Sequence, residues 1–248
     1  MTKAEMQSIV NAYLAEQLNC SENDLIKEAT TCVRSNSKDP FLKILISGKA
    51  VIVSASEGIY DKICELLQGK SKDEIFECPL VYGQTIHFIP ELKYVKEPVL
   101  PSEYTYALLE GNEIYGLSDI KGFDNSLVFD ENGSTTTEIV LAAYKGNSVV
   151  AMAGAEIITD KLWEVGVDVM PAYRQSGLAT ALVQKLTFEI IKREVVPFYS
   201  SSITNIASQM VANRAGYIPY WVDSWGNVFD SFYPYDRTLD LSDYKTDN

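Results

Sequence analysis

The sequence predicts a mixed α/β fold whose sheet is mostly antiparallel, with a small α/β unit at its N-terminal end. Apolar residues recur every three or four positions in some segments, as on one face of a helix, and alternate with small or polar residues in others, as in a half-buried strand. Two strand-like segments flank a tight turn and therefore predict a hairpin. The 248 residues are 46% hydrophobic and 22% charged, which is typical of a globular protein that can bury a core.

The first 98 residues predict an N-terminal α/β extension. Their apolar patterns predict helices over residues 3–18, 21–29 and 59–67 and a strand over residues 50–53. Ser21 followed by Asp24 is typical of a residue that caps the start of a helix. Three prolines between residues 90 and 101 predict the connection to a second domain, residues 99–248.

The second domain has the clearer pattern. It predicts strands over residues 138–144, 149–158, 163–169 and 196–202 and helices after Gly177 and Asn205. Residues 145–148 form the turn of the hairpin, and Pro171 ends the pairing of the third strand because proline donates no backbone hydrogen bond. Asn205 is typical of a residue that opens a helix and Gly216 of one that ends it.

The segment 167–180 has the features of an anion site. Small residues at Ser176, Gly177 and Ala179 let a ligand approach the backbone, and the first N–H groups of a helix point outward with the positive end of its dipole. Arg174 adds a guanidinium group that can hold a phosphate. The alternative is an ordinary helix start.

This segment resembles the signature of the GNAT superfamily of acyl-CoA-dependent N-acetyltransferases, which is Arg or Gln, two residues, Gly, one residue, then Gly or Ala. Arg174, Gly177 and Ala179 satisfy it, after an alternating strand and Pro171. Downstream, Asn205 and the pair Gly216-Tyr217 are similar to the later motif of the family. The resemblance covers about residues 100–240, and the N-terminal extension is similar to that of the zwittermicin-resistance-type subgroup.

The resemblance implies a GNAT-like sheet with a splayed parallel strand pair, and acetyl-CoA as cosubstrate, with no metal. A bulged strand at residues 167–169 would part from the strand at 198–202, and the pantetheine arm would lie in the opening. The implied cofactor-binding residues are Val167, Asp168, Val169, Arg174, Gln175, Ser176, Gly177, Leu178, Ala179, Thr180, Asn205 and Ser208.

The usual catalytic side chains of the family are missing. Trp163 and Val165 occupy the strand positions that often supply a base, and Ala212 occupies the helix position that often carries a tyrosine acid. Attack by an alkyl amine on a thioester needs a base, because an amine of pKa near 10.4 is protonated at neutral pH.

Glu156 is the candidate base. If residues 160–161 form a two-residue turn, Thr159 faces Leu162, and Glu156 then lies opposite Val165 and shares its face. In the same register, Glu164 and Glu138 face away from the side of the sheet that normally holds the base. The alternative is that Glu156 is an ordinary carboxylate near a strand end.

Charge and composition argue against several other classes of protein. With 21 Lys and Arg against 34 Asp and Glu, the net charge is −13, which argues against nucleic-acid or membrane partners and favours a cationic ligand. No signal-like start and no apolar run of about 20 residues occurs, which favours the cytoplasm. Four cysteines lack metal-ligand spacing and are interpreted as reduced structural thiols: Cys20, Cys32, Cys64 and Cys78.

The sequence therefore predicts a cytoplasmic enzyme that transfers an acetyl group from acetyl-CoA to the primary amine of a small molecule, such as an antibiotic, polyamine or amino compound. The alternatives are a non-catalytic acyl-CoA-binding or regulatory module and an acetyltransferase of protein amines. Aromatic residues between Tyr217 and Tyr235 favour final strands and a contact between two copies of the chain, and Tyr233 and Tyr235 are candidate acids. The amine and the acyl chain length stay open.

Overall fold

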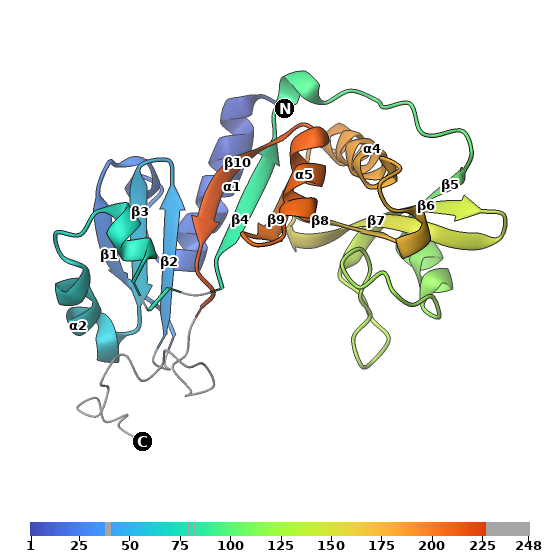
Figure 1. The fold of residues 1–248 in the computed structure, drawn as a ribbon. Coiled ribbons are helices and arrows are strands. Elements are labelled where there is room, and N and C mark those ends of the chain that lie inside the picture. The colour runs from blue at the N-terminus through green and yellow to red at the C-terminus, as the bar shows by residue number, and fades with distance from the viewer. Residues whose placement is uncertain (38–40, 79, 82, 227–248) are drawn as a thin grey trace. The chain divides into compact units, whose positions relative to one another are not determined.

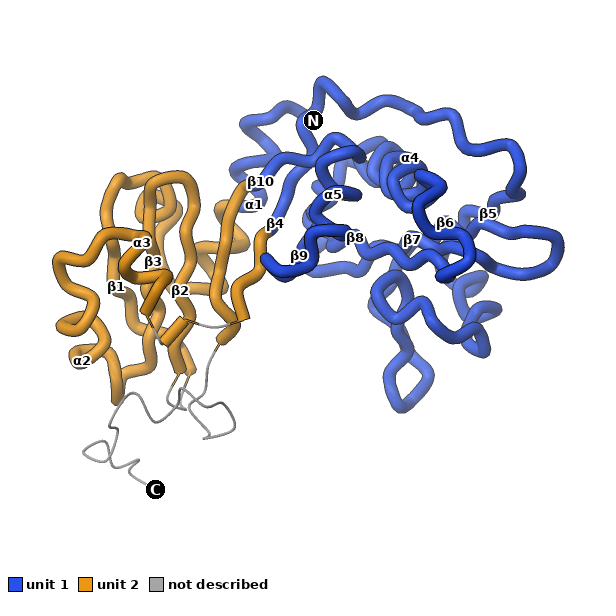
Figure 2. The backbone as a smooth tube through the Cα atoms, viewed as in Figure 1, with its two compact units in different colours: residues 1–10, 87–219 blue, residues 11–86, 220–248 orange. Residues whose placement is uncertain are grey.

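The computed structural model describes residues 1–37, 41–78, 80–81 and 83–226 (Figure 1). The chain forms two compact units, each built from two stretches: unit 1 is Met1–Val10 with His87–Pro219, and unit 2 is Asn11–Ile86 with Tyr220–Asn248 (Figure 2). The predicted division at residue 98 stays a prediction. In the described part of the chain, no helix has both the length and the apolar character that a bilayer crossing requires.

Unit 2 is built on a small mixed sheet. β1 (Thr30–Arg34) runs parallel to β3 (Ala50–Ala55), and β3 runs antiparallel to β2 (Leu42–Ser47). Residues 221–223 of β10 (Tyr217–Asp223) pair antiparallel with β2. All six residues of β3 are buried, as expected for a central strand. Two helices, α2 (Glu57–Leu67) and α3 (Lys72–Phe76), follow β3 in the chain and bury Ile59, Ile63, Leu67 and Ile75.

The N-terminal predictions are confirmed in part. The helix over residues 3–18 is α1 (Lys3–Leu18), and the predicted strand and second long helix are β3 and α2. The short helix at 21–29 is wrong: only a 3-10 turn, η1 (Asp24–Ile26), forms there. Ser21 does not accept a capping hydrogen bond, because its backbone N and its Oγ both donate to Asp24 Oδ2, at 3.0 and 2.6 Å.

Unit 1 holds the larger sheet, with strand order β4-β9-β8-β7-β6-β5. The strands are β4 (Thr85–Pro90), β5 (Thr105–Glu110), β6 (Thr137–Lys145), β7 (Ser148–Thr159), β8 (Leu162–Val169) and β9 (Val196–Ser202). The β8–β9 pair is parallel, while the pairs from β5 to β8 are antiparallel. The fold is therefore the predicted mixed α/β class with a mostly antiparallel sheet, and the predicted β6–β7 hairpin is present.

Helices and loops cover the two faces of this sheet. α4 (Leu178–Lys192) packs on β7 and β8 and contacts α5 (Ile206–Arg214), whereas a 3-10 segment, η3 (Gly111–Leu117), and the loop after it lie on the opposite face (Figure 1). The buried residues of the second face are Ile114, Leu117, Phe123, Leu127, Val140, Ala142, Val149 and Met152. The sheet is thus the middle layer of this unit.

Candidate active site

The parallel strands β8 and β9 part before they end. Their ladder runs from the pair Leu162↔Val196 to the pair Val165↔Tyr199. β8 continues to Val169 and β9 to Ser202, so the last residues of both strands have no partner across this edge. The predicted splayed pair is therefore present. The predicted bulge at residues 167–169 is wrong, because residues 163–169 pair with β7 in unbroken register.

In the segment that leads from β8 into α4, side chains donate hydrogen bonds to nearby backbone carbonyls. Arg174 Nε donates to Val169 O at 3.0 Å, and Ser176 Oγ donates to Tyr173 O at 2.7 Å. Gln175 and Gly177 both have positive φ, 64° and 82°, so the chain turns sharply just before the helix. These contacts leave the loop residues Arg174 to Gly177 exposed.

The N-terminus of α4 carries no side-chain cap. Gly177 is its N-cap residue, and among the described residues no side chain accepts from the first turn. The first hydrogen bond of the helix is from Ala181 N to Gly177 O, at 3.1 Å. The N–H groups of residues 178–180 therefore have no acceptor within the helix and carry the positive end of its dipole. Leu178 is buried, while Ala179 and Thr180 are half-buried.

The second predicted motif forms a hydrogen-bonded group at the start of α5. Asn205 caps the helix, as predicted, with its Oδ1 accepting from Ser208 N at 3.1 Å. Ser208 Oγ lies 2.9 Å from the hydroxyl of Tyr199, the last residue of β9 that pairs with β8. Burial raises the pKa of Tyr199, which outweighs the opposing effect of Ser208, so the phenol stays protonated at neutral pH. Nothing in the pattern of β9 distinguished Tyr199 from a core residue.

Asp168 binds a loop from the opposite face of the sheet. Its Oδ2 accepts from Asn125 N at 2.8 Å and from both Ser126 N and Ser126 Oγ at 3.0 Å, and its Oδ1 accepts from Asn125 Nδ2 at 2.6 Å. The side chain predicted to contact the cofactor is therefore occupied by the loop. Val167 and Val169, on the α4 side, are half-buried, and the carbonyl of Val169 already accepts from Arg174.

The register predicted for Glu156 is wrong by one residue. Glu156 lies opposite Glu164, and Val165 lies opposite Ala155, because an irregularity between Ile157 and Thr159 shifts the hairpin count. Glu156 is exposed and accepts from Thr136 Oγ1 at 2.6 Å. Its role as a base stays a prediction, but the argument that Glu156 shares a face with Val165 no longer holds.

A better placed carboxylate is that of Glu164. It is half-buried and accepts a hydrogen bond from Ser200 Oγ. Ser200 is the first residue of β9 beyond the paired ladder, so this contact lies at the mouth of the opening. Glu164 also shares a face with Asp168, because side chains two residues apart in a strand point the same way. The sequence analysis set Glu164 aside because it points to the face opposite to Val165, which the register confirms, but no local pattern predicted its contact with Ser200.

The positions where the resemblance expected catalytic side chains are filled by core residues. Trp163, Val165 and Ala212 are 8%, 2% and 0% exposed. None of the three carries a group that titrates in water near neutral pH. Among the described residues, no group of three or more His, Cys, Asp or Glu side chains could hold a metal ion.

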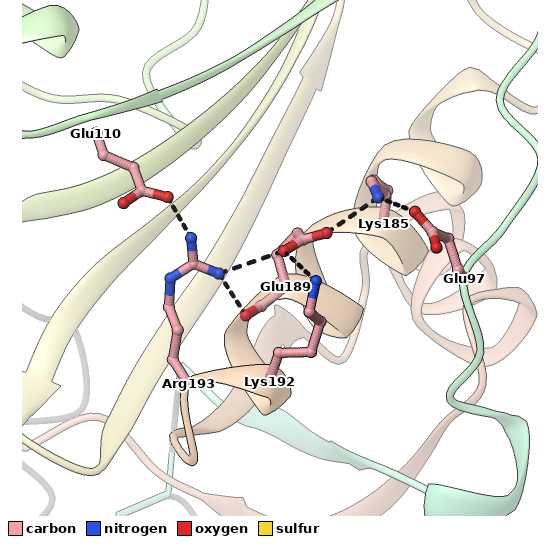
Figure 3. A network of polar contacts seen from close by, with 6 residues as sticks. All are labelled: Glu97, Glu110, Lys185, Glu189, Lys192 and Arg193. Carbon is pink, nitrogen blue, oxygen red and sulfur yellow. Dashed lines mark hydrogen bonds and ion pairs between the residues drawn. The ribbon is translucent and has the colours of Figure 1, made fainter.

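The C-terminal half of α4 is held by charged side chains. The network consists of Glu97, Glu110, Lys185, Glu189, Lys192 and Arg193 (Figure 3). Glu189 lies at its centre, with Lys185 at 3.0 Å and Lys192 at 3.4 Å. Burial raises the pKa of Glu189, but its hydrogen bonds and ion pairs with the two lysines outweigh burial and leave it below the ordinary value. Lys185 also pairs with Glu97, which ties the segment after β4 to the helix.

The parting strands, the loop with two left-handed residues and the uncapped helix all fall in one stretch of sequence. Residues 136–220 match the model of the GNAT acetyltransferase family. The GNAT segment runs from the start of β6 into β10 and thus contains every predicted cofactor-binding residue. None of the curated proteins matches the chain.

Solved GNAT structures resemble the chain at low identity. A GCN5-related N-acetyltransferase-like protein from Streptococcus suis is 17% identical, with a TM-score of 0.49, over 90% of this chain and 100% of its own. A putative GNAT-family acetyltransferase from Novosphingobium aromaticivorans is also 17% identical, with a TM-score of 0.44, over 57% of this chain and 63% of its own. This chain thus spans less than two thirds of the Novosphingobium protein.

Proposed function

We propose that the chain transfers an acetyl group from acetyl-CoA to a primary amine of a small molecule. The observation that carries this proposal is the opening between β8 and β9 beside the uncapped N-terminus of α4, both within the GNAT segment. An extended thioester can lie in such an opening, while the helix start and the exposed guanidinium of Arg174 attract its pyrophosphate.

The proposed reaction is attack of the amine nitrogen on the thioester carbonyl carbon. A C–N bond forms, the C–S bond breaks, and one proton passes from the amine to a base while the thiolate of CoA takes up another. Glu164, bonded to Ser200 at the opening, is the proposed base, with Glu156 as the second candidate. The hydroxyls of Tyr199 and Ser208, 2.9 Å apart, are the proposed proton donors to the thiolate. Acid and base groups of this kind contribute about 10²- to 10⁴-fold each.

Charge supports a cationic acceptor. Glu156, Glu164 and Asp168 lie on one face of the β7–β8 pair. Within the described residues none of these three carboxylates forms an ion pair with Lys or Arg. A diamine or polyamine, which keeps one ammonium group while another reacts, fits this face better than an anionic acceptor does. The cytoplasmic location and a contact between two copies remain part of the proposal.

The second candidate is a non-catalytic acyl-CoA-binding module. It is favoured by the three core side chains at the expected catalytic positions, Trp163, Val165 and Ala212. Such a module would bind acetyl-CoA and release no CoA with any amine. Both candidates therefore bind acetyl-CoA, but only the enzyme releases CoA when an amine is added.

The first test is calorimetric titration of the folded protein with acetyl-CoA. We expect a dissociation constant in the micromolar range, about −8 kcal/mol, and a loss of at least about tenfold in Gly177→Glu, whose carboxylate opposes the pyrophosphate. Gly146→Glu is the matched control. Both glycines have positive φ, 82° and 61°, and a Cβ at either has no neighbour within 4 Å, but Gly146 lies in the β6–β7 turn. Absence of binding to the wild type would refute both candidates.

Turnover then separates the two candidates. CoA release is measured with spermidine, short diamines and aminated antibiotics as acceptors. Release with any of these amines supports the enzyme, and Glu164→Gln is expected to lower kcat by about 10²-fold or more. Glu156→Gln is the paired control from the directly opposite position. A larger loss in Glu156→Gln would make Glu156 the base instead.

A further inference from the structure

We infer that Asp168 is a positioning residue that fixes the wall of the acceptor site by holding the loop Phe123–Leu127 on the sheet. The inference rests on the proposed function and names a specificity-determining element for it. Its basis is the set of contacts that join this loop to β7 and β8.

The Asp168 carboxylate is used almost entirely by the loop. It accepts four hydrogen bonds between 2.6 and 3.0 Å, and all four donors belong to two successive residues, Asn125 and Ser126. Two of these donors are backbone N–H groups, so the carboxylate fixes the path of the loop backbone as well as its side chains. Hydrogen bonds to a charged acceptor are stronger than those between neutral groups.

Two glycines let the same loop lie directly on the strands. Gly154 of β7 and Gly166 of β8 are cross-strand partners. A Cβ at Gly166 would overlap the carbonyl oxygen of Asn125, and a Cβ at Gly154 would overlap that of Ser126. Glycine inside a strand is typical of a place where another backbone approaches closely. The loop is therefore held by two independent features at the same two residues.

The loop segment borders the opening on the side away from α4. Gly166 and Asp168 belong to the part of β8 that has no partner on β9. β8 leads through the loop that contains Arg174 to the start of α4, which would hold the pyrophosphate. α4 covers the face of the sheet opposite to the one that carries Asn125 and Ser126 (Figure 1). An amine that approaches a thioester in the opening from the face away from α4 therefore meets Asn125 and Ser126. Residues at the loop surface, rather than Asp168 itself, would contact the amine.

The test compares Asp168→Asn with Asp130→Asn. Asp130 is an aspartate of the same loop region that also accepts backbone bonds, from Asn132 N at 2.9 Å and Ser134 N at 2.8 Å, and both donors lie within four residues of it in the same loop. We expect Asp168→Asn to increase hydrogen exchange at the amides of Asn125 and Ser126 by at least about tenfold. We expect it to raise KM for the amine by about tenfold while Kd for acetyl-CoA stays within about twofold. Asp130→Asn should change none of these three quantities.

The outcomes are distinct. If the wild type fails to bind acetyl-CoA, the proposed function fails, and with it the role of the wall in amine binding. If the wild type turns over and Asp168→Asn leaves KM for the amine unchanged, the inference alone is wrong. An equal rise in Kd for acetyl-CoA would assign Asp168 to the cofactor instead. Should Asp168→Asn fail to fold, Ser126→Ala is the second variant. It removes the hydroxyl that lies 3.0 Å from both Asp168 Oδ2 and Phe123 O, and it is expected to raise KM by a smaller factor in a folded protein.

Discussion

The two ends of helix α4 are built in opposite ways. At the C-terminal end, Glu189 is 9% exposed and lies among the cations of Lys185, Lys192 and Arg193. At the N-terminal end, the helix starts from Gly177 without a side-chain cap, and the preceding loop satisfies only its own backbone. One end therefore has its charges paired within the protein, while the other leaves donors and positive potential for a ligand. Stability and acetyl-CoA binding should accordingly respond to changes at different ends.

The largest effect on stability is expected from Glu189→Gln. The variant keeps the size of the side chain but removes the charge that the cations surround, so we expect the free energy of unfolding to fall by about 2 kcal/mol. Denaturant unfolding measures this. The affinity for acetyl-CoA should stay unchanged, and a parallel loss of affinity would contradict the division of the helix. Glu97→Gln is the control, because Glu97 pairs with the same Lys185 but is mostly exposed and should cost less than about 1 kcal/mol.

The same carboxylate predicts how stability depends on pH. Because the pKa of Glu189 is lowered in the folded chain, its contribution is fully present above the unfolded value of about 4.3 and is lost as the pH falls through the folded value. The melting temperature of the wild type should therefore drop below about pH 4.5 more steeply than that of Glu189→Gln. Thermal unfolding between pH 3 and 7 tests this. Parallel curves for the two proteins would mean that Glu189 titrates alike in the folded and unfolded chain.

At the other end, Arg174→Ala should weaken binding without weakening the fold. Its guanidinium is exposed, and its Nε donates to the carbonyl of Val169 at 3.0 Å. We expect Kd for acetyl-CoA to rise about five- to tenfold, with a smaller salt dependence than in the wild type. The free energy of unfolding should change by no more than about 0.5 kcal/mol. Calorimetry at two salt concentrations measures both effects, and an unchanged Kd would remove Arg174 from the site.

The comparison also explains which parts of the site the sequence could predict. The hairpin turn, the start of α4 and the cap at Asn205 depend on residues within a few positions of one another, so local patterns predicted them. The partners of Asp168 lie 42 and 43 residues away in the chain. No local pattern connects them, although the glycines at 154 and 166 inside predicted strands were a signal of close backbone approach.

The pairing register of β7 with β8 was the second feature of the site that the sequence could not predict. A single irregularity between Ile157 and Thr159 moved Glu156 from Val165 to Glu164. Because side chains alternate between faces, one extra residue reverses the face predicted for every side chain beyond it. The prediction for Glu156 failed for this reason, because Glu156 shares the face of Glu164 and not that of Val165. The strands β1 and β2 were missed as well, whereas the fold class depended on the clearer second half and was predicted correctly.

The smallest predicted effect compares the start of α5 with that of α4. The N-terminus of α5 is closed by Asn205, whose Oδ1 accepts from Ser208 N. Asn205→Ala removes this cap and should lower the free energy of unfolding by about 1 kcal/mol. Asn205→Asp keeps the accepting oxygen and should retain wild-type stability, but it replaces the amide donor with a charge. If Asn205 also contacts the cofactor, Asn205→Asp weakens acetyl-CoA binding in a fully stable protein. Wild-type affinity in Asn205→Asp would limit Asn205 to capping, and α4 would then be the only one of the two helix starts that serves the ligand.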